Sequence, residues 1–511
     1  MEQGTTYQSN LYRPLSDAQV RKIADEAFRV LEKGGMLVYS RTAREALRKA
    51  GAPVDESSKL VRFPRGLVED AIASNPSSIT LHGRKPGREA VLEKNRVHYG
   101  TGGTAIYVLD PDTGERRPST IEDVILNARM VERLENIHVF TINVFPNEIE
   151  HQDQIDVNRF FHALDNTGKH VMGGMYSFAG CRRAVEMAEQ IAGSAEQLRQ
   201  RPFVSYITLI ISPFKIDDQY GEITCYLAQK GLPVVVPTEP ICGTTAPVTL
   251  AGNLLTHIAE TLGGVTLVQC VRKGAPAICG SVGSITNLQT MDHVGGAIER
   301  AMINAAVSQL AQYFEIPLYS TGGTTDAIEL DVQAAYETAM SSLLVAMSGA
   351  NYIHDIAGLM EADLTVCYRK LVMDNEILGM CQRVLRGIEV NDETLAADLL
   401  IRRGPGSQFV DADHTIRHMR DEFFMPAISS REKRELPGRT PATLAAKEFV
   451  EQVRREEPLP LIDPHLRKQI LERFPEVMVP AIGPTDLRRR TSKTGADDAI
   501  EATGRCSGRP L

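Results

Sequence analysis

Short apolar runs alternate eight times with amphipathic stretches of helical length over about 290 residues in the middle of the chain. Apolar runs of this length are typical of buried parallel strands, and the stretches between them repeat with the period of a helix. The expected strands are Val97–Gly100, Ile137–Val144, His170–Tyr176, Val204–Ile211, Pro233–Val236, Ala277–Gly280, Pro317–Ser320 and Ala350–His354. The expected helices are Ile121–Leu134, Asp153–Leu164, Arg182–Ala192, Tyr220–Gln229, Pro247–Thr261, Val294–Tyr313, Glu329–Ala346 and Leu364–Leu385.

Eight consecutive strand–helix units match the count and length of a TIM barrel, so we predict an α/β protein built on a (β/α)8 barrel. A doubly wound open sheet fits less well, because no GxGxxG motif follows the first strand and no GxxxxGK motif occurs. The stretch Val265–Arg272 stays undecided between an extra helix turn and a strand.

Helical additions are expected on both sides of the barrel, which is assigned to residues 78–385. Residues 1–77 form a helical N-terminal segment, in which Ser16 and Gln19 predict a capping box. Residues 386–480 form a helical C-terminal segment. Residues 481–511 are expected to be a disordered tail, because they contain little to bury.

Composition argues for a globular protein with a large core and against some classes of function. A hydrophobic content of 43% in 511 residues is enough for a large core, and a net charge of −9 argues against a nucleic-acid binder. The first residues lack a signal pattern, and the eight cysteines form no CxxC pair, so a cytoplasmic protein with reduced thiols is expected.

Chemistry in such barrels lies at the carboxyl ends of the strands. The most suggestive of these ends runs from Ile316 to Asp326, where an apolar strand opens into two glycines, two threonines and an aspartate. The full set expected at the strand ends is Tyr99, Gly102, Gly103, Asn143, Glu148, Tyr176, Ser212, Phe214, Glu239, Gly280, Ser281, Thr321–Asp326, His354 and Asp355.

Aromatic rings and carboxylates at one mouth suit a positively charged amine, since a cation over an aromatic face gains about 0.5–1 kcal/mol in water and about 2 when desolvated. No GxSxG, HExxH or zinc-spaced Cys/His cluster is present. His414 and His418 have metal spacing, but nearby arginines disfavour a cation there, so we predict no metal site. His354, Glu239, Tyr99 and Tyr176 also have purely structural interpretations.

Several stretches together resemble the trimethylamine:corrinoid methyltransferase family over roughly residues 90–430. They are Tyr99–Gly103, Leu109–Asp110, Thr113–Pro118, Lys273–Gly280, Gly322–Asp326 with Asp331 and Gln333, Gly349–Asn351 with His354, and Phe409 with His414, Thr415 and Arg420. The resemblance implies a barrel whose mouth receives a methylated amine, and a separate corrinoid protein whose cobalt accepts the methyl group. It also implies a homo-oligomer.

Two features of the sequence bear on where the corrinoid is carried and on which amine is used. Asp292-His293 is not followed by the spacing of the DxHxxG motif of cobalamin carriers, so the corrinoid is expected on a partner. Trimethylamine-using members of the family carry pyrrolysine after the seventh strand, whereas Ala327–Leu330 has only standard residues. The chain thus resembles members that use glycine betaine or related quaternary amines, with trimethylamine as the other candidate substrate.

The roles that we expect are hypotheses, drawn from the strand-end positions and from the chemistry of methyl transfer from a cation. Catalysis is assigned to His354 and Glu239. Substrate binding is assigned to Tyr99, Tyr176, Phe214, Gly322, Gly323, Thr324 and Asp326, and contact with the cofactor to Gly102, Gly103 and Gly280. The alternatives are a TIM-barrel lyase or aldolase, against which the absence of a Lys at any strand end argues, and a non-catalytic protein that binds methylated amines. A zinc-dependent betaine:thiol methyltransferase is disfavoured because the cysteine cluster it needs is missing. The particular amine, the carrier, the downstream methyl acceptor and the number of subunits remain open.

Overall fold

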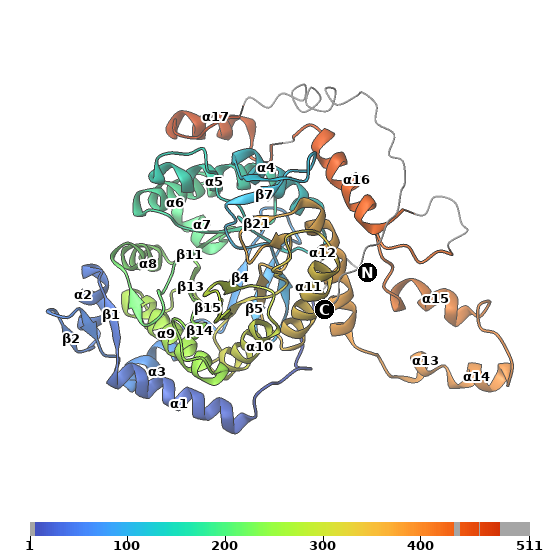
Figure 1. The fold of residues 1–511 in the computed structure, drawn as a ribbon, viewed down its shortest axis with the longest axis horizontal. Coiled ribbons are helices and arrows are strands. Elements are labelled where there is room, and N and C mark those ends of the chain that lie inside the picture. Colours follow the sequence, from blue (N-terminus) through green and yellow to red (C-terminus); the bar gives the residue numbers. More distant parts are fainter. Residues whose placement is uncertain (1–5, 434–439, 459, 481–511) are drawn as a thin grey trace.

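The computed structural model describes residues 6–433, 440–458 and 460–480, and its centre is an eight-stranded parallel sheet (Figure 1). The strands are β6 (His98–Tyr99), β9 (Val139–Thr141), β10 (His170–Gly174), β11 (Val204–Ile207), β13 (Val234–Thr238), β15 (Ala277–Ser281), β18 (Leu318–Thr321) and β19 (Tyr352–His354). Their order is β6-β19-β18-β15-β13-β11-β10-β9, and a parallel bridge from Gly100 to Val139 joins the two ends. The predicted barrel is confirmed.

One long helix follows each strand and packs around the sheet. These helices are α4 (Ile121–Arg133), α5 (Gln152–Asn166), α6 (Phe178–Ala192), α8 (Asp218–Lys230), α9 (Leu250–Val271), α10 (Ile298–Tyr313), α11 (Val332–Met347) and α12 (Tyr368–Arg386). The undecided stretch Val265–Arg272 is the end of α9. This helix is apolar and long enough to cross a membrane, but 83% of its most apolar window is buried in the protein.

The amino end of the barrel is covered by the hairpin of β4 (Ser78–Leu81) and β5 (Ala90–Glu93). Side chains alternate along each strand, so every second residue points inward. The inward set and the hairpin share one apolar cluster, made of Ile79, Leu81, Ala90, Leu92, Val139, Met172, Val235, Ile278, Tyr319 and Tyr352. Because this end is filled, a ligand reaches the barrel from the carboxyl end.

Short strands in the loops build the rim at that carboxyl end. One small sheet joins β20 (Leu359–Met360), β21 (Thr365–Val366), β7 (Tyr107–Leu109) and β8 (Arg116–Pro118). Another joins β14 (Ile241–Cys242), β16 (Ser284–Thr286) and β17 (His293–Val294). Since β21 occupies the residues just before it, α12 begins at Tyr368 rather than at Leu364 as expected.

The N-terminal segment contains strands as well as the expected helices α1 (Asp17–Lys33), α2 (Arg41–Lys49) and α3 (Arg65–Ser74). The predicted capping box at Ser16 and Gln19 is present. The additional strands are β1 (Met36–Val38), β2 (Val54–Asp55) and β3 (Leu60–Val61). Strand β1 pairs with β12 (Lys215–Ile216) from the barrel loops on one side and with β3 on the other, and β3 pairs with β2. Strands of two or three residues are too short to show periodicity, which is why the sequence did not reveal them.

The C-terminal segment divides into two parts. Helix α16 (Ala442–Arg455) packs on α12 and α4, and α17 (Pro464–Arg473) packs on α6, as the short α7 (Ala195–Gln200) also does. The helices α13 (Asp392–Leu395), α14 (Ala397–Arg403) and α15 (Asp413–Glu422) instead project away from the barrel (Figure 1). The expected tail, residues 481–511, lies outside the described residues.

Candidate active site

A cavity of about 350 Å³ opens at the carboxyl end of the barrel. Its lining combines aromatic rings, carboxylates and histidines with a few small apolar groups. The lining residues are Gly103, Thr104, Gly174, Met175, Tyr176, Ile207, Thr208, Leu209, Tyr220, Pro237, Glu239, Val282, His293, Tyr319, His354, Asp355, Ala362, Asp363 and Leu364.

His354 is fixed at the end of β19 by three neighbours. Its Nε2 lies 2.7 Å from Thr321 Oγ1, whose own hydroxyl donates to the Ser281 carbonyl at 2.8 Å. The Thr321 hydroxyl has one hydrogen, and it is used in the bond to Ser281. In the hydrogen bond between Thr321 and His354, the proton is therefore on Nε2 of the histidine. Nδ1 lies 2.8 Å from Asp355 Oδ1, and the ring stacks on Tyr319 with centroids 3.7 Å apart.

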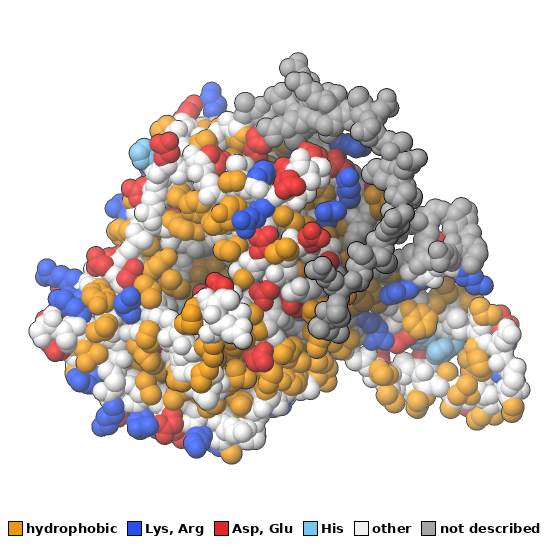
Figure 2. Space-filling model, in the orientation of Figure 1, with side chains coloured by type: hydrophobic (Ala, Val, Ile, Leu, Met, Phe, Trp, Pro, Cys, Tyr) orange, Lys and Arg blue, Asp and Glu red, His pale blue; other side chains and the backbone are white. Residues whose placement is uncertain are grey.

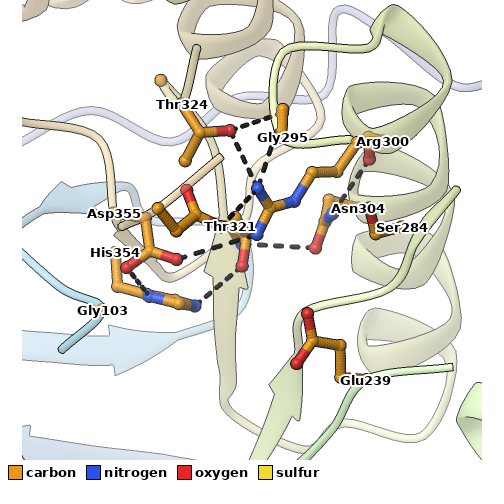
Figure 3. A network of polar contacts seen from close by, with 12 residues as sticks. Gly103, Glu239, Ser284, Gly295, Arg300, Asn304, Thr321, Thr324, His354 and Asp355 are labelled. Carbon is orange, nitrogen blue, oxygen red and sulfur yellow. Dashed lines mark hydrogen bonds and ion pairs between the residues drawn. The ribbon is translucent and has the colours of Figure 1, made fainter. Parts of the chain in front are cut away.

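A buried arginine on α10 organises the carboxylates behind the histidine (Figure 3). Arg300 is only 3% exposed, and its Nη1 donates to Asp363 Oδ2 at 2.8 Å and to Thr324 Oγ1 at 3.0 Å. Its Nη2 lies 3.9 Å from Asp355 Oδ2. Burial by itself would raise the pKa of Asp363, but the charges of Arg300 and His293 outweigh it and hold that pKa below its ordinary value. Asp363 is thus ionised at neutral pH.

Glu239 approaches the cavity from the end of β13, across from Arg300 (Figure 3). Its side chain is 42% exposed, and Oε1 lies 3.8 Å from His293 Nδ1. Loss of hydration within the mouth raises the pKa of Glu239 above its ordinary value, although Arg300 and His293 oppose the shift. The carboxylate can therefore meet a ligand, and it takes up a proton at a higher pH than an ordinary glutamate does.

The backbone is strained where the last loop crosses the mouth. Asp355, Glu361, Ala362 and Asp363 all have positive φ, at 60°, 51°, 50° and 72°. Such conformations cost roughly 1–3 kcal/mol each for residues other than glycine and concentrate at functional sites. The amides of Glu361 and Ala362 donate to the carbonyls of Ala327 and Thr325, each at 3.2 Å, which holds the loop in place.

Several buried polar atoms around the cavity have no hydrogen-bond partner among the described residues. They include Nε and Nη2 of Arg300, Oδ1 of Asp363 and Nδ1 of His293. Buried polar groups normally have partners, and unsatisfied ones are costly. Their concentration at one place indicates a site prepared for a ligand with both donors and acceptors.

Tyrosines form one wall of the cavity. Tyr176 is held by its backbone amide, which donates to the buried Asp156 carboxylate at 3.0 Å, and the Arg159 guanidinium lies 5.0 Å from its ring centroid. Burial raises the pKa of Asp156 to about 7, although Arg159 opposes the shift. Tyr220 begins α8 beside Tyr176 in the lining, and Tyr319 completes the aromatic set.

The structure brings four of the expected site residues together at the cavity: His354, Glu239, Tyr176 and Gly103. Four others lie behind its wall. Gly323 accepts a hydrogen bond from Lys370 Nζ, and Thr324 and Asp326 both bond to Gly295. Gly322 is buried against Ile353. These residues support the loop that carries the site and do not line the cavity.

Four expected residues are placed elsewhere. Tyr99 is fully buried on the helix side of β6, where its ring stacks on His138, and Phe214 packs in the same outer core after donating its amide to Glu260. Gly102 and Gly280 are buried in tight packing, since a Cβ would lie 2.4 Å from Asp355 Oδ1 at Gly102 and 2.4 Å from Pro237 Cα at Gly280. Both glycines are therefore needed for close packing, and neither reaches the cavity.

Sequence reasoning missed Arg300, His293, Asp363, Tyr319 and Tyr220. Arg300 stands on an otherwise apolar face of α10, four residues before the buried Asn304, and this polar pair in an apolar stretch was the available signal. Tyr319 precedes Thr321 by two residues on β18, so both belong to the inward-facing set. For His293, on the two-residue strand β17, and for Asp363, in a loop, the sequence offers no comparable pattern.

His414 and His418, the pair with metal spacing, lie on α15, which projects away from the barrel (Figure 1). His414, His418 and Glu393 come together, but Arg417 Nη2 donates to the same Glu393 oxygen at 2.8 Å. This contact, followed by that of His418, lowers the pKa of Glu393. The Arg417 guanidinium occupies the position beside the Glu393 carboxylate that a metal ion would need, so we assign no metal to this cluster.

A closed parallel barrel with a polar cavity at its strand ends is an architecture of enzymes. The family model for trimethylamine methyltransferase (MTTB) matches residues 2–474. The chain is 36% identical to a trimethylamine methyltransferase of Desulfitobacterium hafniense strain DCB-2, covering 80% of this chain and 82% of that protein. It is 28% identical to a glycine betaine methyltransferase of strain Y51, covering 82% and 87%. Among solved structures, the monomethylamine methyltransferase of Methanosarcina barkeri is similar with a TM-score of 0.47 and 14% identity, covering 87% of this chain and 95% of that one.

Fold, cavity and relatives together define a methyltransferase. The chain belongs to the trimethylamine methyltransferase family, as its motifs led us to expect.

Proposed function

We propose that the chain transfers a methyl group from a methylated ammonium compound to the corrinoid of a separate carrier protein. The observation that carries the proposal is the cavity, where three carboxylates (Glu239, Asp355 and Asp363) and three tyrosines surround a space of about 350 Å³. A small cation fits this volume and chemistry. A corrinoid is far larger than the cavity, so its reactive face would have to be presented at the mouth by another protein.

A quaternary amine is the substrate class we favour. The Co(I) corrinoid supplies a strong nucleophile for the methyl carbon, and a quaternary ammonium then leaves as a neutral tertiary amine without further activation. Glycine betaine is such a compound, and the name of one relative points to it. Trimethylamine is the second candidate, since the names of several relatives point to it.

The protein's own residues would bind and orient the cation. Glu239 and the ionised Asp363 balance its charge, and Tyr176 offers an aromatic face. Asp355 and Tyr319 hold the His354 ring against the reacting end of the ligand. All of these groups are held by contacts within the barrel, so the site can restrict the substrate to one orientation and exclude water.

We further propose a cytoplasmic homo-oligomer. The seven cysteines in the described ranges are all free, which agrees with a reducing compartment.

The direct test is to incubate the purified chain with a carrier protein in the Co(I) state and a panel of methylated amines. Formation of methyl-Co(III) with glycine betaine or another quaternary amine, followed by absorbance, supports the proposal. Binding of an amine without transfer would favour a sensor, and transfer with trimethylamine alone would reverse our choice of substrate.

The Glu239→Gln variant is expected to raise KM for the amine about 10–100-fold, because one balancing charge is lost. In the wild type, affinity should also fall as the pH drops through the raised pKa of Glu239, since protonation removes the same charge. The variant should lack this acidic decline. Glu148→Gln is the control, because Glu148 binds the Ile121 amide outside the cavity, and an equal effect there would contradict the assignment.

Tyr176→Leu is expected to weaken amine binding by ~1–2 kcal/mol through loss of the aromatic face. Tyr99→Phe is the comparison, because the Tyr99 hydroxyl is buried with no hydrogen-bond partner among the described residues and its ring faces the helix layer. Calorimetric titration of both variants measures the difference. Equal dissociation constants for Tyr176→Leu and the wild type would make Tyr176 a purely structural residue.

A further inference from the structure

Asn304 is a fully buried amide in an otherwise apolar layer of the molecule. Figure 2 shows hydrophobic side chains gathered over the region of α10 and α11, and the α10 neighbours of Asn304, Ile303 and Ala305, are buried as well. A buried amide costs free energy unless its donors and acceptors have partners. The hydrogen bonds of Asn304 lead to the place where β15 and β18 end.

The orientation of this amide is fixed by its neighbours (Figure 3). Its nitrogen donates to the carbonyls of Gly283 at 3.2 Å and Arg300 at 2.9 Å, and a carbonyl only accepts. The amide oxygen therefore faces the strands. It accepts from the Ser281 hydroxyl at 2.7 Å and from the Thr321 backbone amide at 3.2 Å.

The bond from Thr321 to Asn304 replaces a bond of the parallel sheet. The ladder between β15 and β18 ends at the pair Gly280 and Tyr319. In the evenly spaced pattern of a parallel pair, the next bond would join the Thr321 amide to the Ser281 carbonyl. Asn304 accepts from that amide instead, so the Ser281 carbonyl is open to another donor.

The donor at this carbonyl is the Thr321 hydroxyl, 2.8 Å from the oxygen. Because its single hydrogen is used there, the hydroxyl meets His354 Nε2, at 2.7 Å, with a lone pair, and Nε2 donates. The hydrogen bonds of a histidine decide which ring nitrogen carries the proton. Asn304 therefore acts, through Thr321, on a ring that lines the cavity.

We propose that Asn304 is a positioning residue that keeps a proton on Nε2 of His354. When an apolar side chain replaces Asn304, the Thr321 amide completes the ladder to Ser281, and the displaced Thr321 hydroxyl donates to Nε2. The ring then carries its proton on Nδ1, where Asp355 Oδ1 lies 2.8 Å away.

Nitrogen-15 NMR of the full-length chain, labelled at histidine, tests this proposal without amine, corrinoid or carrier protein. The chemical shift of Nε2 distinguishes a protonated nitrogen from an unprotonated one, and the His354 signals are those missing from His354→Gln. The spectra are recorded at alkaline pH, where an ordinary imidazole is neutral. We expect a protonated Nε2 in the wild type and an unprotonated Nε2 in Asn304→Leu, which has nearly the same volume.

Variants of Thr321 and Ser281 separate the hydrogen bonds from the packing. Thr321→Val keeps the shape but removes the acceptor, so Nε2 should again be unprotonated, whereas Thr321→Ser keeps the hydroxyl and should match the wild type. Ser281→Ala is the control, because it removes one bond to Asn304 and leaves the Ser281 carbonyl and the Thr321 amide in place. If Asn304→Leu does not fold, Asn304→Ser takes its place, since its hydroxyl is too short to reach Thr321.

A second readout rests on the proposed function and uses the carrier assay. In Asn304→Leu, kcat is expected to fall about 100-fold, because His354 no longer presents the same proton to the ligand. KM for the amine should change by less than about 3-fold, since the carboxylates and tyrosines of the cavity are untouched. Thr321→Val should show the same split, and Thr321→Ser should restore kcat.

A protonated Nε2 in folded Asn304→Leu would overturn the proposal, as would an unprotonated Nε2 in the wild type or in Ser281→Ala. A wild-type kcat in a variant whose ring proton has moved would overturn the positioning role. If the spectra agree with expectation but the wild type transfers no methyl group, the proposed function fails and the assignment of the His354 proton stands.

Discussion

The Arg300→Met variant loses about 3–5 kcal/mol of its free energy of unfolding and nearly all of its methyl-transfer activity. Arg300 is the only positive partner that is fully buried beside Asp355 and Asp363 in the described structure. Removing one member of a buried ion pair leaves the other charge without compensation, and penalties of this size follow. Urea unfolding at pH 7 measures the stability, and the carrier assay measures the activity.

The double variant Arg300→Met/Asp363→Asn separates charge from packing. It should recover part of the lost stability, because Asp363 no longer carries a buried charge, but little of the activity. If the double variant is as unstable as Arg300→Met, the loss comes from packing and the electrostatic account is wrong.

Between pH 4.5 and pH 7 the fold becomes less stable by ~3 kcal/mol through Glu260 alone. Burial raises the pKa of Glu260 to about 7, and the hydrogen bonds from Thr238, the Phe214 amide and Ser212 offset only part of that shift. Above pH 4.5 the unfolded chain releases this proton while the folded chain still holds it, so the folded state loses stability as pH rises. Above pH 7 the loss is complete.

The Glu260→Gln variant isolates this contribution, since Asp156 adds a change of the same sign to the total. Denaturant unfolding of the variant and the wild type at pH 4.5, 6 and 8 should give a difference that grows in favour of the variant as pH rises. Glu122→Gln at an exposed position of α4 should show no such trend. A parallel pH dependence in Glu260→Gln and the wild type would mean that this glutamate is ionised throughout.

The barrel was predictable because its strands and helices repeat a strong local pattern, and local signals such as the Ser16–Gln19 capping box appear in the structure. For a short strand, the face of the sheet on which each side chain lies was less predictable. In β6, which has two residues, His98 and Tyr99 face opposite sides, and a shift of one residue exchanges them. A two-residue strand has no periodicity from which to choose between them, so Tyr99 was expected at the mouth although it faces the helices.

The site itself depends on residues that meet only in three dimensions. An arginine on an amphipathic helix usually marks the solvent face, so Arg300 was not singled out, and its position four residues before Asn304 on an apolar face was the single local signal. Arg300 is buried because the loop from Asp355 to Asp363 folds over α10. No local pattern in either segment predicts that the two segments meet. The strand-end rule nonetheless singled out Glu239, Tyr176 and His354, which all line one cavity.

The hairpin of β4 and β5 has a kinetic consequence. Because the hairpin closes the amino end of the barrel, small molecules in the described structure reach the cavity through its mouth at the carboxyl end. A protein docked above that mouth would use the same opening. Under the proposed function, the amine would have to enter before the carrier arrives, and the demethylated product would wait until the carrier departs. Turnover would then follow a compulsory order, with excess carrier slowing the reaction by blocking entry.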